Sequence, residues 1–202
     1  MLLVQDLSLE RLDKKIFQDI NLSLGSNKIV VLKGRNGSGK TSLIKTILCI
    51  LEPTSGSMFW KAKPIKNKLY DFYDNVTYIS DKTSSIRQLT IAHNIKIWKK
   101  FFLSKLDNNQ INGILTNLNL NDLIDKKVST LSLGEIKKLE LLRLVLEEKK
   151  IWILDEPLNN LDSDTIEILI QTFEDHCENG GSILFSTHQD LQINISEKIL
   201  LK

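Results

Sequence analysis

An apolar strand, a glycine-rich loop and a helix follow one another near the start of the chain, and this order constrains the fold more than any other feature. The loop is Gly34-Arg35-Asn36-Gly37-Ser38-Gly39-Lys40-Thr41, a complete G-x-x-x-x-G-K-[ST] pattern. The apolar run 29–32 precedes it and a helical run over 42–48 follows it. Glycines let backbone N–H groups surround a phosphate chain, and the N-terminus of the next helix adds a positive dipole. The sequence therefore predicts a site for a nucleoside triphosphate.

The lysine and the threonine of this loop have expected tasks. Lys40 supplies a positive charge for the β- and γ-phosphates, and the Thr41 hydroxyl suits Mg²⁺. ATP and Mg²⁺ are therefore the expected ligands. The residues expected to contact ATP are Gly34, Arg35, Asn36, Gly37, Ser38, Gly39, Lys40, Thr41 and Ser42.

Two acids end a second apolar strand far downstream. The strand is the run 151–154, and Asp155 and Glu156 follow it directly. Asp155 is suited to the Mg²⁺ shell, and Glu156 is suited to orient or deprotonate the water that attacks the γ-phosphate. A surface turn is the alternative interpretation of such a pair, and the phosphate loop upstream favours catalysis.

Strands and helices alternate at both ends of the chain. The pattern predicts strands near 2–9, 19–24, 58–60, 76–80 and 182–186, helices near 136–146 and 163–177, and a mostly helical stretch over about 90–127. This alternation favours an α/β core with a parallel sheet that carries a helical arm.

Three short motifs resemble those of ATP-binding-cassette (ABC) ATPases. Leu131-Ser132-Leu133-Gly134-Glu135 resembles the family's signature, whose usual form is Leu-Ser-Gly-Gly-Gln. Asn159-Asn160-Leu161-Asp162 resembles the D-loop, and Ser186-Thr187-His188 resembles the switch histidine. Each string is short, but their order and spacing across almost the whole chain make the resemblance specific.

The resemblance implies a fold and a mechanism. The implied fold is a P-loop NTPase core of the α/β class, with a mostly parallel sheet, an N-terminal antiparallel β portion and an inserted helical arm. It would form one domain over 1–202, with the helical subdomain at roughly 82–135. Two copies would pair head to tail around two ATP molecules. Glu156 and His188 would be catalytic, while Ser132, Gly134 and Glu135 would contact the ATP held by the opposite copy, beside the D-loop residue Asp162.

The chain departs from the family pattern at several positions. Lys82 stands where the family places a glutamine at the entrance of the arm, so it would either touch phosphate or point away. Arg11 stands near the place of the usual adenine-stacking aromatic residue, and an arginine plane can also stack on a base. Leu133 and Glu135 replace a glycine and a glutamine of the signature, which we expect to slow turnover.

Composition limits the kinds of partner that the chain is expected to bind. The net charge of +2 gives no reason to expect nucleic acid, and the lysines at 61, 63, 66 and 68 suit a solvated loop or hairpin. The N-terminus has no secretory pattern, and no run approaches the roughly 18–20 apolar residues of a membrane span. We expect a soluble chain that meets a membrane only through a partner.

Several strings also resemble the ATP-binding subunit of the haem exporter used in cytochrome c maturation. They are Lys14-Lys15-Ile16-Phe17, Ser57-Met58-Phe59-Trp60, the run 151–157 and Thr187-His188-Gln189. The resemblance implies a peripheral subunit on the cytoplasmic face of the inner (plasma) membrane, bound to an integral membrane permease. Another ABC transporter, a soluble ABC ATPase of translation or chromosome maintenance, and a regulatory nucleotide-binding module remain as alternatives.

The arm is the expected contact with the permease. Apolar and aromatic residues recur there at helix-like spacing, and core packing is the favoured interpretation of each one. These residues are Ile95, Ile97, Trp98, Phe101 and Phe102. The arm as a whole would provide a groove for a cytoplasmic helix of the membrane subunit.

Overall fold

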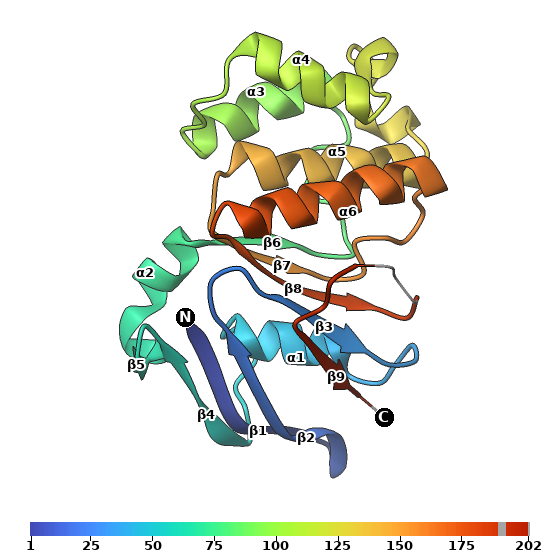
Figure 1. The fold of residues 1–202 in the computed structure, drawn as a ribbon. Coiled ribbons are helices and arrows are strands. Elements are labelled where there is room, and N and C mark those ends of the chain that lie inside the picture. The colour runs from blue at the N-terminus through green and yellow to red at the C-terminus, as the bar shows by residue number, and fades with distance from the viewer. Residues whose placement is uncertain (190–192, 202) are drawn as a thin grey trace.

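The computed structural model describes residues 1–189 and 193–201, whose strands form two sheets (Figure 1). The smaller sheet is antiparallel, in the order β2-β1-β4-β5. Its strands are β1 (Leu2–Arg11), β2 (Lys14–Leu24), β4 (Ser55–Trp60) and β5 (Lys63–Pro64). The larger sheet is parallel, in the order β6-β7-β8-β3-β9. Its strands are β3 (Ile29–Lys33), β6 (Val76–Ile79), β7 (Ile151–Leu154), β8 (Ser182–Thr187) and β9 (Glu197–Leu200).

Helices cover both faces of the parallel sheet (Figure 1). Helix α1 (Lys40–Ile47) lies between the two sheets, whereas α5 (Leu133–Leu146) and α6 (Ser163–Glu178) lie on the opposite face. Helices α3 (Ile91–Phe101) and α4 (Asn108–Asn117) stack on α5 as an outer layer. The short helix α2 (Leu69–Asp74) leads into β6, and 3-10 turns occupy Ile65–Lys68, Asn121–Leu123 and Val128–Thr130.

Successive residues of the parallel strands pack into opposite layers. Val30 and Leu32 of β3 join the cluster that contains α1 and the antiparallel sheet. Val31, between them, joins the cluster that contains α5 and α6. A strand buried on both faces has no polar positions, so its sequence is a continuous apolar run. This is why the strands at 29–32 and 151–154 could be predicted.

The arm encloses a third apolar cluster, built from α3, α4 and α5. Ile95 and Trp98 are buried in it and Phe102 packs against it, as expected. The prediction of core packing was wrong for Ile97 and Phe101, which are 42% and 77% exposed. They lie on the face of α3 turned away from this cluster.

Helix α5 belongs to two layers at once. Its Leu139 and Leu142 pack in the arm cluster, while Leu141 and Leu144 pack in the cluster that contains the parallel sheet. A helix shared in this way marks no clean boundary, so the subdomain limits of 82–135 stay a prediction.

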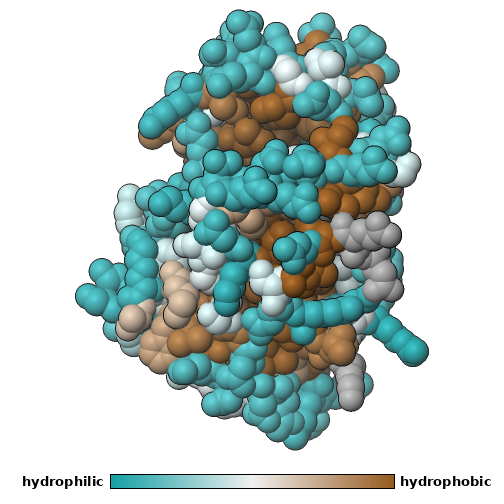
Figure 2. All heavy atoms as spheres, in the orientation of Figure 1, coloured by the Kyte–Doolittle hydropathy of each residue, from teal (hydrophilic) through white to brown (hydrophobic). Residues whose placement is uncertain are grey.

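The predicted fold class is confirmed: an α/β core with a parallel sheet, an antiparallel β portion and a helical arm. The sequence did not indicate β9 or α2. Lysines 61 and 63 lie in the β4–β5 hairpin, as expected, and Lys61 pairs with Asp71. On the face drawn in Figure 2, hydrophilic residues form most of the rim, and hydrophobic residues show mainly inside the outline. Among the described helices, none has the length and apolar character needed to cross a membrane.

Candidate nucleotide site

The glycine-rich loop joins β3 to α1 in a conformation that favours glycine. Gly37 and Gly39 have φ angles of 83° and 95°, in the left-handed region. A Cβ added at Gly34 would overlap the Ser38 hydroxyl and the backbone carbonyl of Leu201. The Ser38 hydroxyl oxygen is itself buried and has no hydrogen-bond partner in the described part of the chain. The loop is therefore a close-fitting cradle with an unsatisfied polar atom.

Helix α1 starts without a side-chain cap. Its N-cap is Gly39, and its first turn carries no acidic residue. The backbone N–H groups at this end remain available to an anion, which the helix dipole also favours. Thr41, the second residue of the helix, is exposed at the same end.

Lys40 is buried beside the loop and links it to the second motif. Its Nζ donates to the carbonyl oxygens of Gly34 at 2.7 Å and Arg35 at 3.1 Å. The same Nζ lies 3.1 Å from Glu156 Oε1, and the other Glu156 oxygen lies 3.3 Å from His188 Nδ1. The Glu156 carboxylate thus bridges the lysine and the histidine that the sequence singled out separately.

Asp155 is held rigidly at the carboxyl end of β7. It is 1% exposed, and its backbone N–H donates to the Ile79 carbonyl oxygen at 2.8 Å. Ser186, on the neighbouring strand β8, donates its hydroxyl to Asp155 Oδ1 at 2.7 Å and accepts the Glu156 N–H at 2.8 Å. The sequence analysis gave Ser186 no role beyond its place in the histidine motif, although parallel strand ends bring such residues together.

The loop and Glu156 border one hollow of about 390 Å³, whereas Asp155 is not among the residues that line it. Lys40, Thr41 and Glu156, which the sequence singled out, line it. Asp81 lines it as well, although the sequence analysis assigned no function to this residue. The available signal was its position directly after the predicted strand 76–80. The remaining lining residues are Ile16, Asn36, Gly37, Gly39, Ser42 and Asn159.

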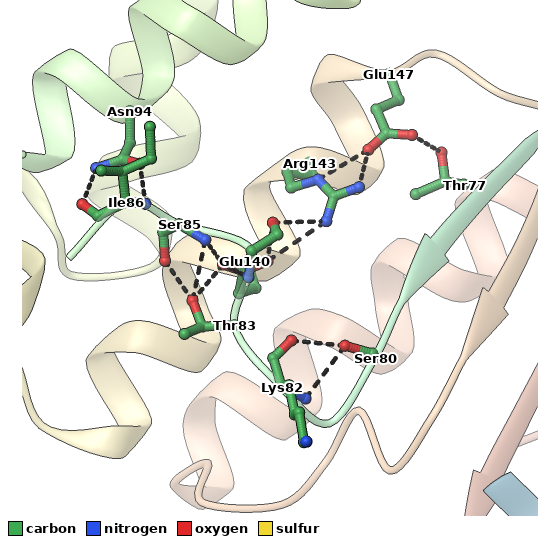
Figure 3. Close-up of polar contacts among 11 residues, drawn as sticks. Thr77, Ser80, Lys82, Thr83, Ser85, Ile86, Asn94, Glu140, Arg143 and Glu147 are labelled. Atoms are coloured by element: carbon green, nitrogen blue, oxygen red, sulfur yellow. Dashed lines mark hydrogen bonds and ion pairs between the residues drawn. The ribbon is translucent and has the colours of Figure 1, made fainter.

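Two expected contributors lie elsewhere. Arg11 is exposed in the β1–β2 hairpin, opposite Lys14, and Ile16 of β2 lines the hollow instead. Lys82 is exposed, and its backbone is bracketed by Ser80, whose hydroxyl accepts the Lys82 N–H and donates to the Lys82 carbonyl oxygen. In Figure 3 the Lys82 ammonium points away from the surrounding hydrogen-bond network. Of the two expectations for Lys82, the structure favours the side chain that points away from this hollow.

The start of α5 is closed on itself. Ser132 is the N-cap, and its hydroxyl accepts the Glu135 N–H at 3.2 Å while Glu135 Oε2 accepts the Ser132 N–H at 2.7 Å. The Ser132 N–H and hydroxyl together hold the pKa of Glu135 below its usual value. A Cβ at Gly134 would lie 2.7 Å from the Asn160 carbonyl oxygen, and Leu133 is 70% exposed. Ser132 and Leu133 line a second hollow, shared with Asp81 and Lys82, and not the one at the phosphate loop.

Asp162 fastens α6 to α5. Its Oδ1 accepts the Thr165 N–H at 2.9 Å and so caps α6, and its Oδ2 lies 2.8 Å from Lys138 Nζ. The hydrogen bonds from Lys138 and Thr165 lower the pKa of Asp162. The D-loop aspartate is therefore a structural link in this chain, with a lysine partner that the sequence analysis did not identify.

The entrance of the arm is bound to α5 by a buried carboxylate (Figure 3). Glu140 accepts hydrogen bonds from Thr83, Ser84 and Ser85 at 2.6 to 2.9 Å. Burial opposes the charge on Glu140, but these hydrogen bonds keep its pKa below the usual value. Arg143 bridges Glu140 and Glu147. The loop that carries Asp81 and Lys82 is thus tied to the helix that begins at the signature.

Comparison with known proteins relates the chain to one family. Residues 17–159 match the family model described as "ABC transporter". The "Cytochrome c biogenesis ATP-binding export protein CcmA" of Reclinomonas americana is 36% identical over 193 residues, which cover 95% of this chain and 86% of that protein. The protein of the same name from Vibrio vulnificus strain YJ016 is 30% identical over 191 residues, covering 95% and 93%. A putative ABC transporter ATP-binding protein from Pyrococcus furiosus superposes with a TM-score of 0.84 over 99% of this chain and 96% of that one, at 24% identity.

Proposed function

Because the chain belongs to the ABC transporter family and is an ABC-type ATPase, we propose that it energises a membrane transporter in cytochrome c biogenesis, by haem export or by release of a haem carrier. The observation that carries the ATPase reaction is the Lys40–Glu156–His188 arrangement beside the phosphate loop. The pathway is supported by relatives with that printed function, which match this chain over nearly its whole length.

ATP would place its phosphates in the cradle of residues 34–42. The uncapped N–H groups of α1 and the Ser38 hydroxyl are donors that need an acceptor, and a polyphosphate supplies acceptors. The Lys40 ammonium would bind a phosphate oxygen, and it would give up its ion pair with Glu156 Oε1 to do so. Charged and uncharged donors thus converge on one anion.

The Mg²⁺ ligands would be Thr41 and Asp155. The hydroxyl and carboxylate oxygens of these residues suit a hard cation. Among the described residues, no group of three or more His, Cys, Asp or Glu side chains could hold a metal ion. That agrees with a cation that takes part of its ligands from substrate phosphates. When bound, Mg²⁺ neutralises charge that develops on the phosphate oxygens.

Glu156, once released by Lys40, would accept a proton from the attacking water. His188 contacts the other carboxylate oxygen and would hold the glutamate in position. The Ser186 hydroxyl binds both the Glu156 N–H and the Asp155 carboxylate, so it fixes the position of the two acidic residues relative to each other. Hydrolysis yields ADP and phosphate.

A second copy would complete each site. Ser132 and Gly134 lie at a helix start and are suited to contact the γ-phosphate of the ATP held by the opposite copy, with Glu135 beside them. The separation of Ser132 from the phosphate-loop hollow within one chain supports this division. One similar fold, a cassette 20% identical with a TM-score of 0.76, was solved as a dimer in a post-hydrolysis state with ADP and phosphate.

The membrane partner would be an integral permease subunit, bound on the cytoplasmic face of the inner membrane. The exposed Ile97 and Phe101 of α3 are apolar positions that such a contact would cover. Pairing of two copies on two permease subunits would raise their effective concentration for ATP-driven closure.

The test is affinity purification from native membranes, with identification of the co-purifying chains and an ATPase assay. Recovery with a small integral membrane subunit and cytochrome c assembly proteins is the expected result. Recovery with a different permease would replace the pathway and keep the ATPase. A partner-free, soluble protein would contradict the transporter assignment and favour a soluble ABC ATPase.

A further inference from the structure

Lys137 is a buried lysine on helix α5. Its side chain is 6% exposed, and its Nζ has no hydrogen-bond partner within residues 1–189 and 193–201. An ammonium taken out of water without a partner destabilises a fold, so a position of this kind needs a reason. Lys137 also lines the hollow that Asp81 and Ser132 share.

The charges around Lys137 belong mainly to the nucleotide site. The carboxylates of Asp81, Asp155, Glu140 and Glu156 all act on its ammonium. Glu140 is already paired with Arg143 and accepts hydrogen bonds from Ser84 and Ser85. The other three follow the ends of β6 and β7: Asp81 lines both hollows, Glu156 lines the phosphate-loop hollow, and Asp155 is buried directly before Glu156. Burial lowers the pKa of Lys137, and these four carboxylates oppose that effect.

We propose that Lys137 is a positioning residue that acts as a fixed counter-charge to the nucleotide-site carboxylates and so weakens the retention of Mg²⁺. This inference rests on the proposed ATPase function. A buried ammonium and a divalent cation that share the field of Asp155 repel each other, and salt screens a buried charge poorly. Lys137 would keep the acids compatible with one another and favour the departure of Mg²⁺ with ADP.

A purely structural role predicts a lower melting temperature on removal of the charge and no gain in Mg²⁺ affinity. Among the described residues Lys137 has no hydrogen bond to lose, so Lys137→Met removes a buried charge and keeps most of the side-chain volume. We expect this variant to bind Mg²⁺·ADP about threefold to tenfold more tightly.

The experiment is calorimetric titration of the full chain with ADP, with and without Mg²⁺, together with thermal melting. The ratio of the two dissociation constants isolates the metal's contribution. The charge-conserving Lys137→Arg is expected to keep the wild-type ratio. Lys96→Met, an equal charge change at an exposed position of α3, is the matched control and should leave the ratio unchanged.

An unchanged or smaller Mg²⁺ effect in Lys137→Met would overturn the proposal, whatever its melting temperature. If that variant does not fold, Lys137→Gln carries the same measurement. Failure of the wild-type chain to bind ADP under either condition would instead refute the nucleotide site itself. The two failures are therefore distinguishable.

Discussion

The phosphate loop and the start of α5 are both helix N-termini suited to phosphate, yet they are built in opposite ways. At α1 the cap is a glycine without a side chain, so the N–H groups are open. At α5 Ser132 and Glu135 cap each other, so both side chains already have partners. A triphosphate can enter the first end directly, whereas at the second the Glu135 carboxylate already occupies the Ser132 N–H and places a negative charge where an anion would arrive.

This difference between the two helix starts predicts that pairing of two chains is less favourable than binding of ATP by one chain. Binding of ATP by one chain needs only the exchange of Glu156 for phosphate at Lys40. Engagement of the opposite copy brings the Glu135 carboxylate, which the Ser132 N–H holds at the start of α5, close to a phosphate. We therefore expect tight binding by the single chain, and weak ATP-driven pairing of two chains.

The largest effect should come from Lys40→Ala, which removes the charge at the open end. The expected loss of ATP affinity is about 100-fold or more, because a buried ammonium–phosphate contact is lost and Glu156 is left beside the phosphates. Calorimetric titration measures it. Lys63→Ala, an exposed change in the β4–β5 hairpin, is the control. Unchanged affinity in Lys40→Ala would remove the phosphate-loop assignment.

Glu156→Gln should separate binding from hydrolysis. Glutamine is nearly isosteric but accepts no proton from water, so turnover should fall about 100- to 1,000-fold while ATP binding is retained. The uncleaved ATP should then hold two copies together, which light scattering can detect. Normal turnover in this variant would show that another group handles the water.

Glu135→Gln tests the closed end. A glutamine can still complete the capping box with Ser132, but it brings no negative charge to the place where phosphate arrives. In a Glu156→Gln background we expect ATP-dependent pairing to tighten about twofold to fivefold. Sedimentation at several protein concentrations measures this, with the exposed α6 change Glu167→Gln as control. Weaker pairing would mean that the carboxylate itself contributes to the interface.

Acidification should tighten ATP-dependent pairing, as Glu135→Gln does, only at low pH. The hydrogen bonds from Ser132 lower the pKa of Glu135, so its charge persists below the usual range of glutamate, about 4.3. A lowered folded-state pKa means that the cap's stability is present above the unfolded pKa and is lost as pH falls through the folded pKa. Pairing that already differs between pH 7 and pH 5 must therefore arise from other groups.

The open end could be predicted from the sequence because its chemistry is local. Gly37 and Gly39 have positive φ angles, which favour glycine, and the neighbouring strands are continuous apolar runs. The closed end also carried a local signal, since Ser132 and Glu135 have capping-box spacing. Because Glu135 departs from the family signature, it was expected to affect turnover. Its hydrogen bond from the Ser132 N–H was not predicted.

Other features depended on distant contacts. Strand β9 has alternating half-buried and exposed residues, and it becomes a strand by pairing with β3. The burial of Lys137 depends on the packing of α5 against elements distant in the sequence, such as β6. Nothing in the residues around it distinguishes Lys137 from the neighbouring Lys138, which is paired with Asp162.

The smallest effect in our comparison should come from Lys82→Gln, which restores the residue that the family pattern expects. Lys82 lines the hollow at α5 and not the phosphate-loop hollow, whereas Asp81, the preceding residue, lines both. We therefore expect less than about a twofold change in Mg²⁺·ATP affinity for Lys82→Gln, and a weakening of about threefold for Asp81→Asn, because the latter removes a carboxylate from the cation's surroundings. Titration of both variants in the same buffer measures the difference, and equal effects would contradict this distinction between the two residues. If partner-stimulated hydrolysis rises in Lys82→Gln while nucleotide affinity stays unchanged, Lys82 acts on coupling to the partner, through the hollow at the start of α5.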